Sequence, residues 1–157
     1  VTAAPPGLLA HPLLDGSYAA GVQSSATDAQ VALVAEMTPG GALLLGSSRE
    51  FAGFDTSVSR PIIAAIAARA ARCIPSLAHA KVIRSYAGLR PWSPDHLPLI
   101  GPVARMPGLF LATGHEGAGI GLAPITGRLI ADWITGGEAR ADAHAYARAV
   151  RPDRFAL

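Results

Sequence analysis

Residues 108–137 read GLFLATGHEGAGIGLAPITGRLIADWITGG and join a short apolar run, a glycine-rich turn and an amphipathic segment. The run Leu109–Thr113 is almost wholly apolar, which is typical of a central strand buried on both faces of a parallel sheet. From Ile120 onward apolar residues recur at helical spacing, and Gly136-Gly137 predicts the end of that helix. A helix that begins at such a turn directs unpaired N–H groups and the positive end of its dipole toward a ligand above the strand.

The composition indicates a folded, rather apolar protein that is part of something larger. Of its 157 residues, 50% are hydrophobic and 15% are charged, whereas a free-standing domain of this size normally carries more charge. The net charge of +2 comes with scattered arginines and predicts no nucleic-acid partner. No apolar run reaches the roughly eighteen residues of a membrane span. We expect a cytoplasmic protein, either free or peripheral to the inner face of a bacterial membrane.

The single cysteine, Cys73, excludes an internal disulfide and a thiolate metal cluster. Its place on an apolar helix face predicts a core residue. No pair of histidines, cysteines or carboxylates has metal-ligand spacing, so the sequence predicts no metal site.

The elements expected elsewhere fit an antiparallel sheet with a packing helix. The segment Thr38–Gly41 reads TPGG and predicts a hairpin turn. Ser59 as N-cap, Pro61 in the first turn and Pro75 beyond the end delimit a helix that packs on the sheet. The further expected elements are strands at 1–3, 30–37, 42–46, 81–88 and 97–103, the helix at 61–73 and a weak helix at 139–150.

The glycine turn leaves two interpretations open from its residues alone. Its glycines at 114, 117, 119 and 121 do not give the G-x-G-x-x-G fingerprint, and no second strand with a terminal acidic residue follows. A self-sufficient nucleotide-binding domain is therefore disfavoured. A tight strand-to-helix connection needs fewer glycines, so the turn favours contact with a ligand, which glycines allow to approach the backbone closely.

Two charged or titratable residues are candidates for chemistry. Arg90, fixed beside Pro91, could hold a carboxylate in two hydrogen bonds, or it could be a solvated surface arginine. His115 could be a general base, or it could shape the turn by hydrogen bonding. Ser93, Asp95 and His96 include the residue types of a catalytic triad, but residues this close in sequence cannot form one.

Ordered motifs along residues 42–155 resemble the C-terminal half of the FAD-dependent D-amino-acid oxidase, glycine oxidase and sarcosine oxidase family. The Gly-His-Glu-Gly turn is similar to that of the catalytic subunits of cyanide synthase, hydroxyproline dehydrogenase and opine oxidase. The motifs are LLLGSSREFAGFD at 43–55, PSL at 75–77, YAGLRPWSPDHLPLIGP at 86–102, ATGHEGAGIGLAP at 112–124 and RF at 154–155.

The resemblance implies an enzyme that oxidises a Cα–N bond by hydride transfer to the flavin of FAD. By position, Arg90 matches the family arginine that pairs with the substrate carboxylate. The turn at residues 114–120 matches the family segment that lies over the flavin ring. That segment stabilises negative charge at the flavin N1 and C2 carbonyl. Two positions depart from the glycine oxidase pattern. Where glycine oxidase has a substrate-facing tyrosine, this sequence has Val34 or its neighbours. Where glycine oxidase has a second arginine, this sequence has Gly117. The residues implied at the flavin are Gly114, His115, Glu116, Gly117, Ala118, Gly119 and Ile120.

The fold class implied is α+β, with an antiparallel substrate-domain sheet and its helix at 1–88. Residues 89–157 then supply the last strand and helix of an FAD-binding dinucleotide fold whose N-terminal half is missing here. The expected partners are that N-terminal half or a second subunit, a small carboxylate-bearing amine, and electron-accepting subunits. The alternative is a non-catalytic fragment or assembly subunit that needs a partner chain to form the FAD site.

Overall fold

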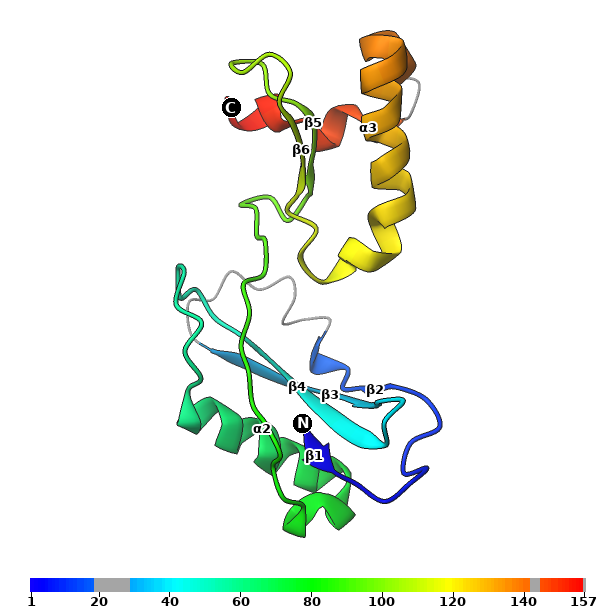
Figure 1. The fold of residues 1–157 in the computed structure, drawn as a ribbon. Helices are drawn as coiled ribbons and strands as arrows, with labels where there is room; N and C mark the ends of the chain where they lie inside the picture. The colour runs from blue at the N-terminus through cyan, green and yellow to red at the C-terminus, as the bar shows by residue number, and fades with distance from the viewer. Residues whose placement is uncertain (19–28, 142–144, 157) are drawn as a thin grey trace. The chain divides into compact units, whose positions relative to one another are not determined.

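The computed structural model describes residues 1–18, 29–141 and 145–156, and the chain divides into two compact units, Val1–Leu89 and Arg90–Leu157. Both units combine antiparallel strands with a helix (Figure 1). The fold is therefore α+β, as predicted. The division falls next to the expected boundary between residues 88 and 89, while the functions assigned to the two parts stay predictions.

The first unit is built on a four-stranded antiparallel sheet in the order β1-β4-β3-β2. The predicted hairpin is present: the Ala42 amide donates to the Thr38 side chain over 3.1 Å and the Thr38 amide donates to the Ala42 carbonyl over 2.7 Å. At the corner, Gly41 takes a φ of 81° that favours glycine. The strands are β1 (Thr2–Ala3), β2 (Leu13–Leu14), β3 (Gln30–Met37) and β4 (Ala42–Arg49).

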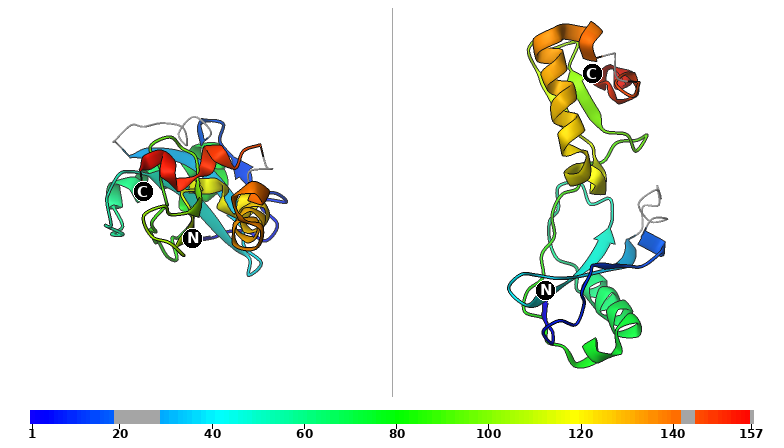
Figure 2. Two further views of the ribbon diagram at one scale, coloured as in Figure 1. Left: turned by 90° about the horizontal axis from the view of Figure 1, so that it is seen from above. Right: turned by 90° about the vertical axis from the view of Figure 1, so that its right-hand side faces the viewer.

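Helix α2 (Arg60–Cys73) covers one face of this sheet (Figures 1 and 2). Pro61 lies in its first turn, and a short 3-10 helix, η1 (Pro75–His79), follows its end. Ser59 stands at the N-cap as predicted, but its side chain makes no capping hydrogen bond. Cys73 is exposed, so its prediction as a core residue is wrong. The buried core between helix and sheet consists of Leu33, Ala35, Leu43, Ala70 and Leu77.

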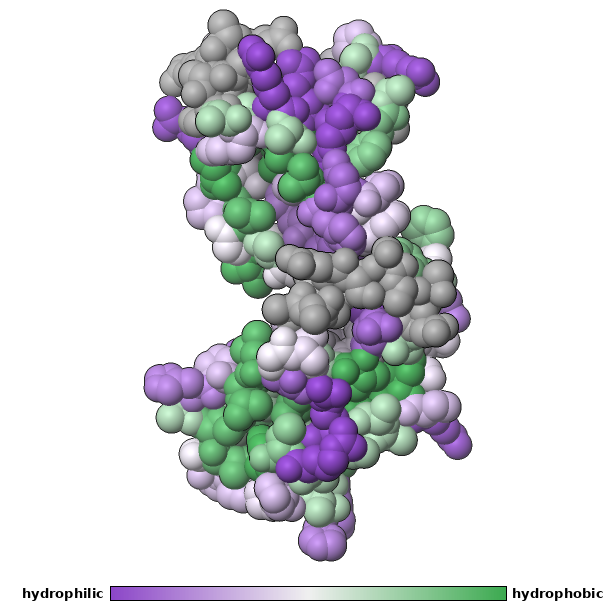
Figure 3. All heavy atoms as spheres, turned by 180° about the vertical axis from the view of Figure 1, so that it is seen from behind, coloured by the Kyte–Doolittle hydropathy of each residue, from purple (hydrophilic) through white to green (hydrophobic). Residues whose placement is uncertain are grey.

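The segment 81–88 is extended but does not form the predicted strand. Only Val82 bridges to Thr2, and the Val1 carbonyl accepts the amide of Ile83 over 2.9 Å. Because β1 is two residues long, it offers too few partners for a full ladder. The side chains of Val82, Ile83, Tyr86 and Leu89 are exposed. Figure 3 shows apolar residues, coloured green, reaching the surface on one face of the protein.

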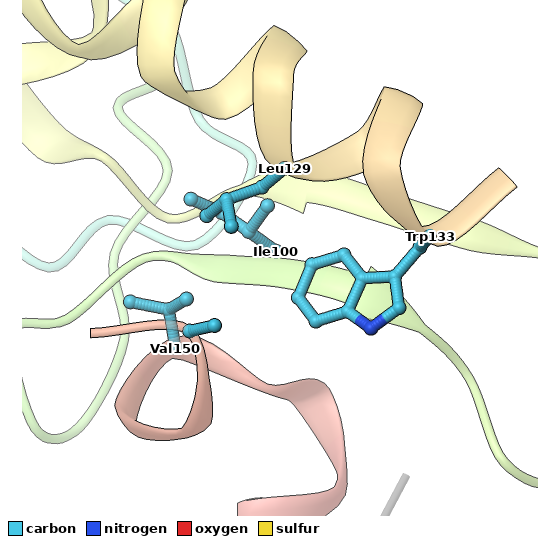
Figure 4. Close-up of a cluster of buried hydrophobic side chains, with 5 residues drawn as sticks. Ile100, Leu129, Trp133 and Val150 are labelled. Carbon is cyan, nitrogen blue, oxygen red and sulfur yellow. The ribbon is translucent and has the colours of Figure 1, made fainter. Parts of the chain in front are cut away.

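The second unit is a two-stranded antiparallel sheet covered by one long helix. Strand β5 (Leu99–Pro102) pairs with β6 (Phe110–Thr113), and helix α3 (Gly119–Ala141) packs on them. The strand expected at 109–113 is present, but β6 pairs antiparallel and its last two residues are exposed, so within this chain it is not a buried central strand. Figure 4 shows part of the core formed by Ile100, Leu129, Trp133, Ala147 and Val150.

Helix α3 runs through Gly136-Gly137 to Ala141, so the predicted stop at the glycines is wrong. Glycine disfavours a helix by only about 1 kcal/mol per residue, and the helix is held by Leu129 and Trp133 in the core. The helix predicted at 139–150 is not continuous. Residues 142–144 lie outside the described part, and η3 (Arg148–Val150) follows as a single 3-10 turn.

Gly101 lets the indole of Trp133 lie directly on β5. It has a φ of 135°, and a Cβ atom at this position would lie 2.9 Å from the Trp133 ring. The absence of a side chain at Gly101 therefore fixes how closely α3 approaches the strand.

Candidate functional site

The predicted glycine turn connects β6 directly to α3. Gly114 is buried with a φ of 79°, and a Cβ atom there would lie 2.9 Å from Leu99 Cδ1 and 3.3 Å from the Leu99 amide nitrogen. A side chain at Gly114 would therefore strain the backbone and clash with Leu99. After Gly114 the chain forms one 3-10 turn, η2 (Glu116–Ala118), and enters α3 at Gly119.

The start of α3 presents small residues and no negative charge. No acidic residue lies in its first turn, and Gly117 and Ala118 are exposed. Ile120 is 95% exposed. A Cβ atom at Gly121 would meet nothing within 4 Å. Because the first amides of a helix lack intrahelical partners, this end of α3 is suited to an electron-rich ligand edge.

His115 is held against α3 by a hydrogen bond. Its Nε2 lies 2.9 Å from the Oγ1 of Thr126, which is buried two turns into the helix. The His115 carbonyl also accepts the amide of Ala118 over 2.9 Å. The Nε2 of His115 is therefore hydrogen-bonded within the second unit, as expected of a residue that shapes the turn.

Glu116 is directed toward the loop that precedes β5. Its Oε1 lies 2.8 Å from His96 Nδ1, and its side chain is only 5% exposed. Its amide donates to the Pro91 carbonyl over 3.2 Å. The two paired residues are twenty positions apart, and no spacing rule in a single sequence links them. The sequence therefore predicted Glu116 as a site residue but missed its partner.

Arg90 is the first residue of the second unit and is half-buried. It stands immediately before Pro91, whose carbonyl binds the glycine turn through Glu116. The structure thus brings the backbone that carries Arg90 to the turn. The role of Arg90 as a carboxylate clamp stays a prediction.

The triad-type residues after Arg90 each have a different structural partner. Ser93 is buried and donates to the Leu97 carbonyl over 2.6 Å, while His96 contacts Glu116. Asp95 accepts two hydrogen bonds from Arg154, at 2.6 and 3.1 Å. They form no catalytic triad, and they hold the loop in place.

Arg154 joins this loop to the C-terminal 3-10 helix η4 (Pro152–Phe155). Besides Asp95, its guanidinium donates to the Leu97 carbonyl over 2.8 Å and the Arg151 carbonyl over 2.9 Å. The hydrogen bonds from Arg154 are the main cause that lowers the pKa of Asp95 to about 2. The closing Arg-Phe motif therefore has a structural function in the second unit.

We expect the contribution of this pair to disappear at low pH. The folded-state pKa of Asp95 lies below the ordinary 3.8, so the stabilisation is present above pH 4 and is lost as the pH falls toward 2. Asp95→Asn should reduce stability above pH 4 by about 1 kcal/mol or less, because a one-third exposed carboxylate is screened by solvent. Urea unfolding at pH 5 and pH 2.5 checks this. A difference between wild type and variant that does not shrink at pH 2.5 would contradict it.

Neither a membrane helix nor a metal cluster is found in the described part of the chain. No helix there is long and apolar enough to cross a bilayer. No group of three or more histidine, cysteine or acidic side chains within residues 1–18, 29–141 and 145–156 could hold a metal ion.

Comparison with known proteins places these features in one family. Residues 7–133 match the family model described as DAO, FAD dependent oxidoreductase. Hydrogen cyanide synthase subunit HcnC of Pseudomonas aeruginosa is 47% identical over 90 residues, which are 57% of this chain and 22% of that protein. Glycine oxidase of the same organism is 42% identical over 111 residues, covering 71% of this chain and 30% of the relative.

The fold comparison agrees. The crystal structure of glycine oxidase from Bacillus cereus matches with a TM-score of 0.69 and 28% identity, covering 87% of this chain and 34% of that structure. The chain spans less than a third of the length of these two curated relatives. Because the family model covers most of the chain, this protein belongs to the DAO family of FAD-dependent oxidoreductases.

Proposed function

We propose that the chain supplies the substrate-side sheet and the flavin-side turn of an FAD-dependent enzyme that oxidises the Cα–N bond of an amino acid or secondary amine. The proposed substrate classes are D-amino acids, glycine, hydroxyproline and opines. The family match and the similarity to glycine oxidase and to the cyanide synthase subunit support this reaction type. The observation that carries the proposal is the accessible, uncharged start of α3 behind the glycine turn.

The residues of the turn fit the pyrimidine edge of a flavin. Gly117 and Ala118 are exposed and lack bulk, so a planar ring can approach the backbone. The dipole of a 23-residue helix starts at Gly119 and favours electron density at that point. The carboxylate of Glu116 is paired with His96 and does not oppose it. When bound, FAD supplies the acceptor for the two electrons removed from the substrate.

Arg90 is the proposed anchor for the substrate carboxylate. A guanidinium offers paired donors that match a carboxylate in two parallel hydrogen bonds. Such a contact orients the Cα–N bond, and no side-chain base is needed if the amine arrives neutral. Pro91 restricts the backbone next to Arg90, which favours a defined position for the clamp.

We further propose that an N-terminal FAD-binding portion or a second subunit completes the site. Relatives are more than three times as long as the matched segment. Apolar side chains such as Tyr86, Leu89 and Ile120 are exposed and would gain burial in a larger assembly. Electron-accepting subunits and a location in the cytoplasm or at the inner face of a bacterial membrane stay predictions.

The proposal is tested in a protein that contains this chain together with an N-terminal FAD-binding segment. Such a protein should carry flavin, and a carboxylate-bearing amine should bleach the flavin absorbance when oxygen is excluded. The second candidate, a non-catalytic assembly subunit, predicts that the same preparation is not reduced by any amine.

A further inference from the structure

We propose that His96 and Glu116 are a positioning pair that fixes the glycine turn of residues 114–119 to the loop that begins at Arg90. The inference rests on the proposed function, in which the turn faces the flavin and Arg90 holds the substrate carboxylate. The pair would set the distance between these two parts of the site.

Glu116 is attached to both ends of the loop. At the far end its Oε1 lies 2.8 Å from Nδ1 of His96. Because a carboxylate only accepts, the imidazole donates this hydrogen bond. At the near end the Glu116 amide donates to the carbonyl of Pro91, next to Arg90. A displacement of the loop therefore moves the turn.

The loop between these two attachment points is fixed by its own hydrogen bonds. Ser93 Oγ donates to the Leu97 carbonyl over 2.6 Å, and the His96 amide donates to the Ser93 carbonyl over 3.0 Å. The Trp92 ring lies edge-on to the His96 ring, with centroids 6.2 Å apart. His96 is thus presented on a preformed support.

Both residues of the pair have left-handed backbone conformations. His96 has a φ of 59° and Glu116 a φ of 48°, in a region that non-glycine residues rarely occupy. Such conformations persist where surrounding contacts determine them and are frequent at functional sites. Here the contact that the two left-handed residues share is the hydrogen bond between their side chains.

The pair also holds the Glu116 carboxylate in the direction of His96. The Glu116 carboxylate belongs to the turn, and its side chain is 5% exposed and hydrogen-bonded to His96. Without this hydrogen bond, the carboxylate could turn toward the start of α3 and compete with an electron-rich ligand for the positive end of the helix dipole. The hydrogen bond therefore sets the distance between the turn and the loop, and it also directs the Glu116 carboxylate toward His96.

Two substitutions of His96 separate the side-chain contact from the backbone conformation. Glycine takes a positive φ freely, so His96→Gly removes the imidazole without adding strain. Asparagine also tolerates this conformation and carries an amide donor, so His96→Asn is the rescue variant. If the position mattered only for its backbone, His96→Gly would behave like the wild type.

Hydrogen exchange on the 157-residue protein gives a readout that needs no flavin. We expect the Glu116 amide to exchange about tenfold faster in His96→Gly. The Val103 amide, which donates to the Leu109 carbonyl over 3.0 Å, should exchange at an unchanged rate and is the internal control. His96→Asn should restore most of the protection. If the Glu116 amide exchanges at the wild-type rate in His96→Gly, or is accelerated equally in both variants, the positioning role of the pair is wrong.

Kinetics of the FAD-loaded assembly provide the second readout. His96→Gly should raise KM for a carboxylate-bearing amine about tenfold with a smaller change in kcat, and His96→Asn should recover the wild-type KM. An unchanged KM in His96→Gly overturns the positioning role. If the wild-type assembly oxidises no amine, the proposed function fails, whereas the exchange result still decides the pair.

Discussion

Arg90→Ala should lower kcat/KM for carboxylate-bearing amines by about 100-fold in the FAD-loaded assembly, mainly through KM. Losing one partner of a desolvated, hydrogen-bonded charge pair costs on the order of 3 kcal/mol, which corresponds to about two powers of ten. Arg90→Lys keeps the charge but loses the planar pair of donors, so its activity should be intermediate.

Two controls make this result specific. Arg105 is an exposed arginine of the same unit, and Arg105→Ala should leave KM near the wild-type value. The corresponding amine without a carboxylate should be oxidised equally well by wild type and by Arg90→Ala. An unchanged KM for carboxylate substrates in Arg90→Ala would remove the clamp from the proposed function.

Leu129→Ala should destabilise the second unit by about 2–5 kcal/mol. Leu129 is 0% exposed and lies among Ile100, Trp133 and Val150 (Figure 4), so the truncation leaves a cavity between α3 and β5. Folded domains are stable by only about 5–15 kcal/mol, so this loss is a large part of the total.

Urea unfolding followed by tryptophan fluorescence reports on this unit specifically, because both tryptophans of the chain, Trp92 and Trp133, lie in it. Ile134→Ala is the matched control, since Ile134 is on the same helix and 62% exposed. Its midpoint should remain close to the wild type. If Leu129→Ala shifts the midpoint no more than Ile134→Ala does, the core assignment is wrong.

Elements with strong local signals were predictable from the sequence. The TPGG turn determines the β3–β4 hairpin. Pro61 and Pro75 bound α2 because proline is accepted in a first turn and destabilises a helix interior, although α3 accommodates Pro124. Strand β2 was missed because Leu13–Leu14 is too short to show an alternating pattern.

Elements that depend on distant partners were not predictable. The pattern at 81–88 fits a strand, but a strand needs a neighbour, and β1 offers only two residues. The turn between β6 and α3 was predictable, because the positive φ at residue 114 favours glycine and the sequence has a glycine there. The contacts of Glu116 with His96 and of Asp95 with Arg154 span 20 and 59 positions, and only the fold brings them together.

The proposed function is tested most directly by an oxygen-free titration of the assembled protein with a carboxylate-bearing amine, monitored by flavin absorbance. We expect one FAD per chain and complete bleaching by one of the proposed substrate classes. Bleaching by the same amine concentration should be greatly reduced in Arg90→Ala. Flavin that stays oxidised with glycine, D-amino acids, hydroxyproline and opines, or an assembly that binds no flavin, would contradict the proposed function.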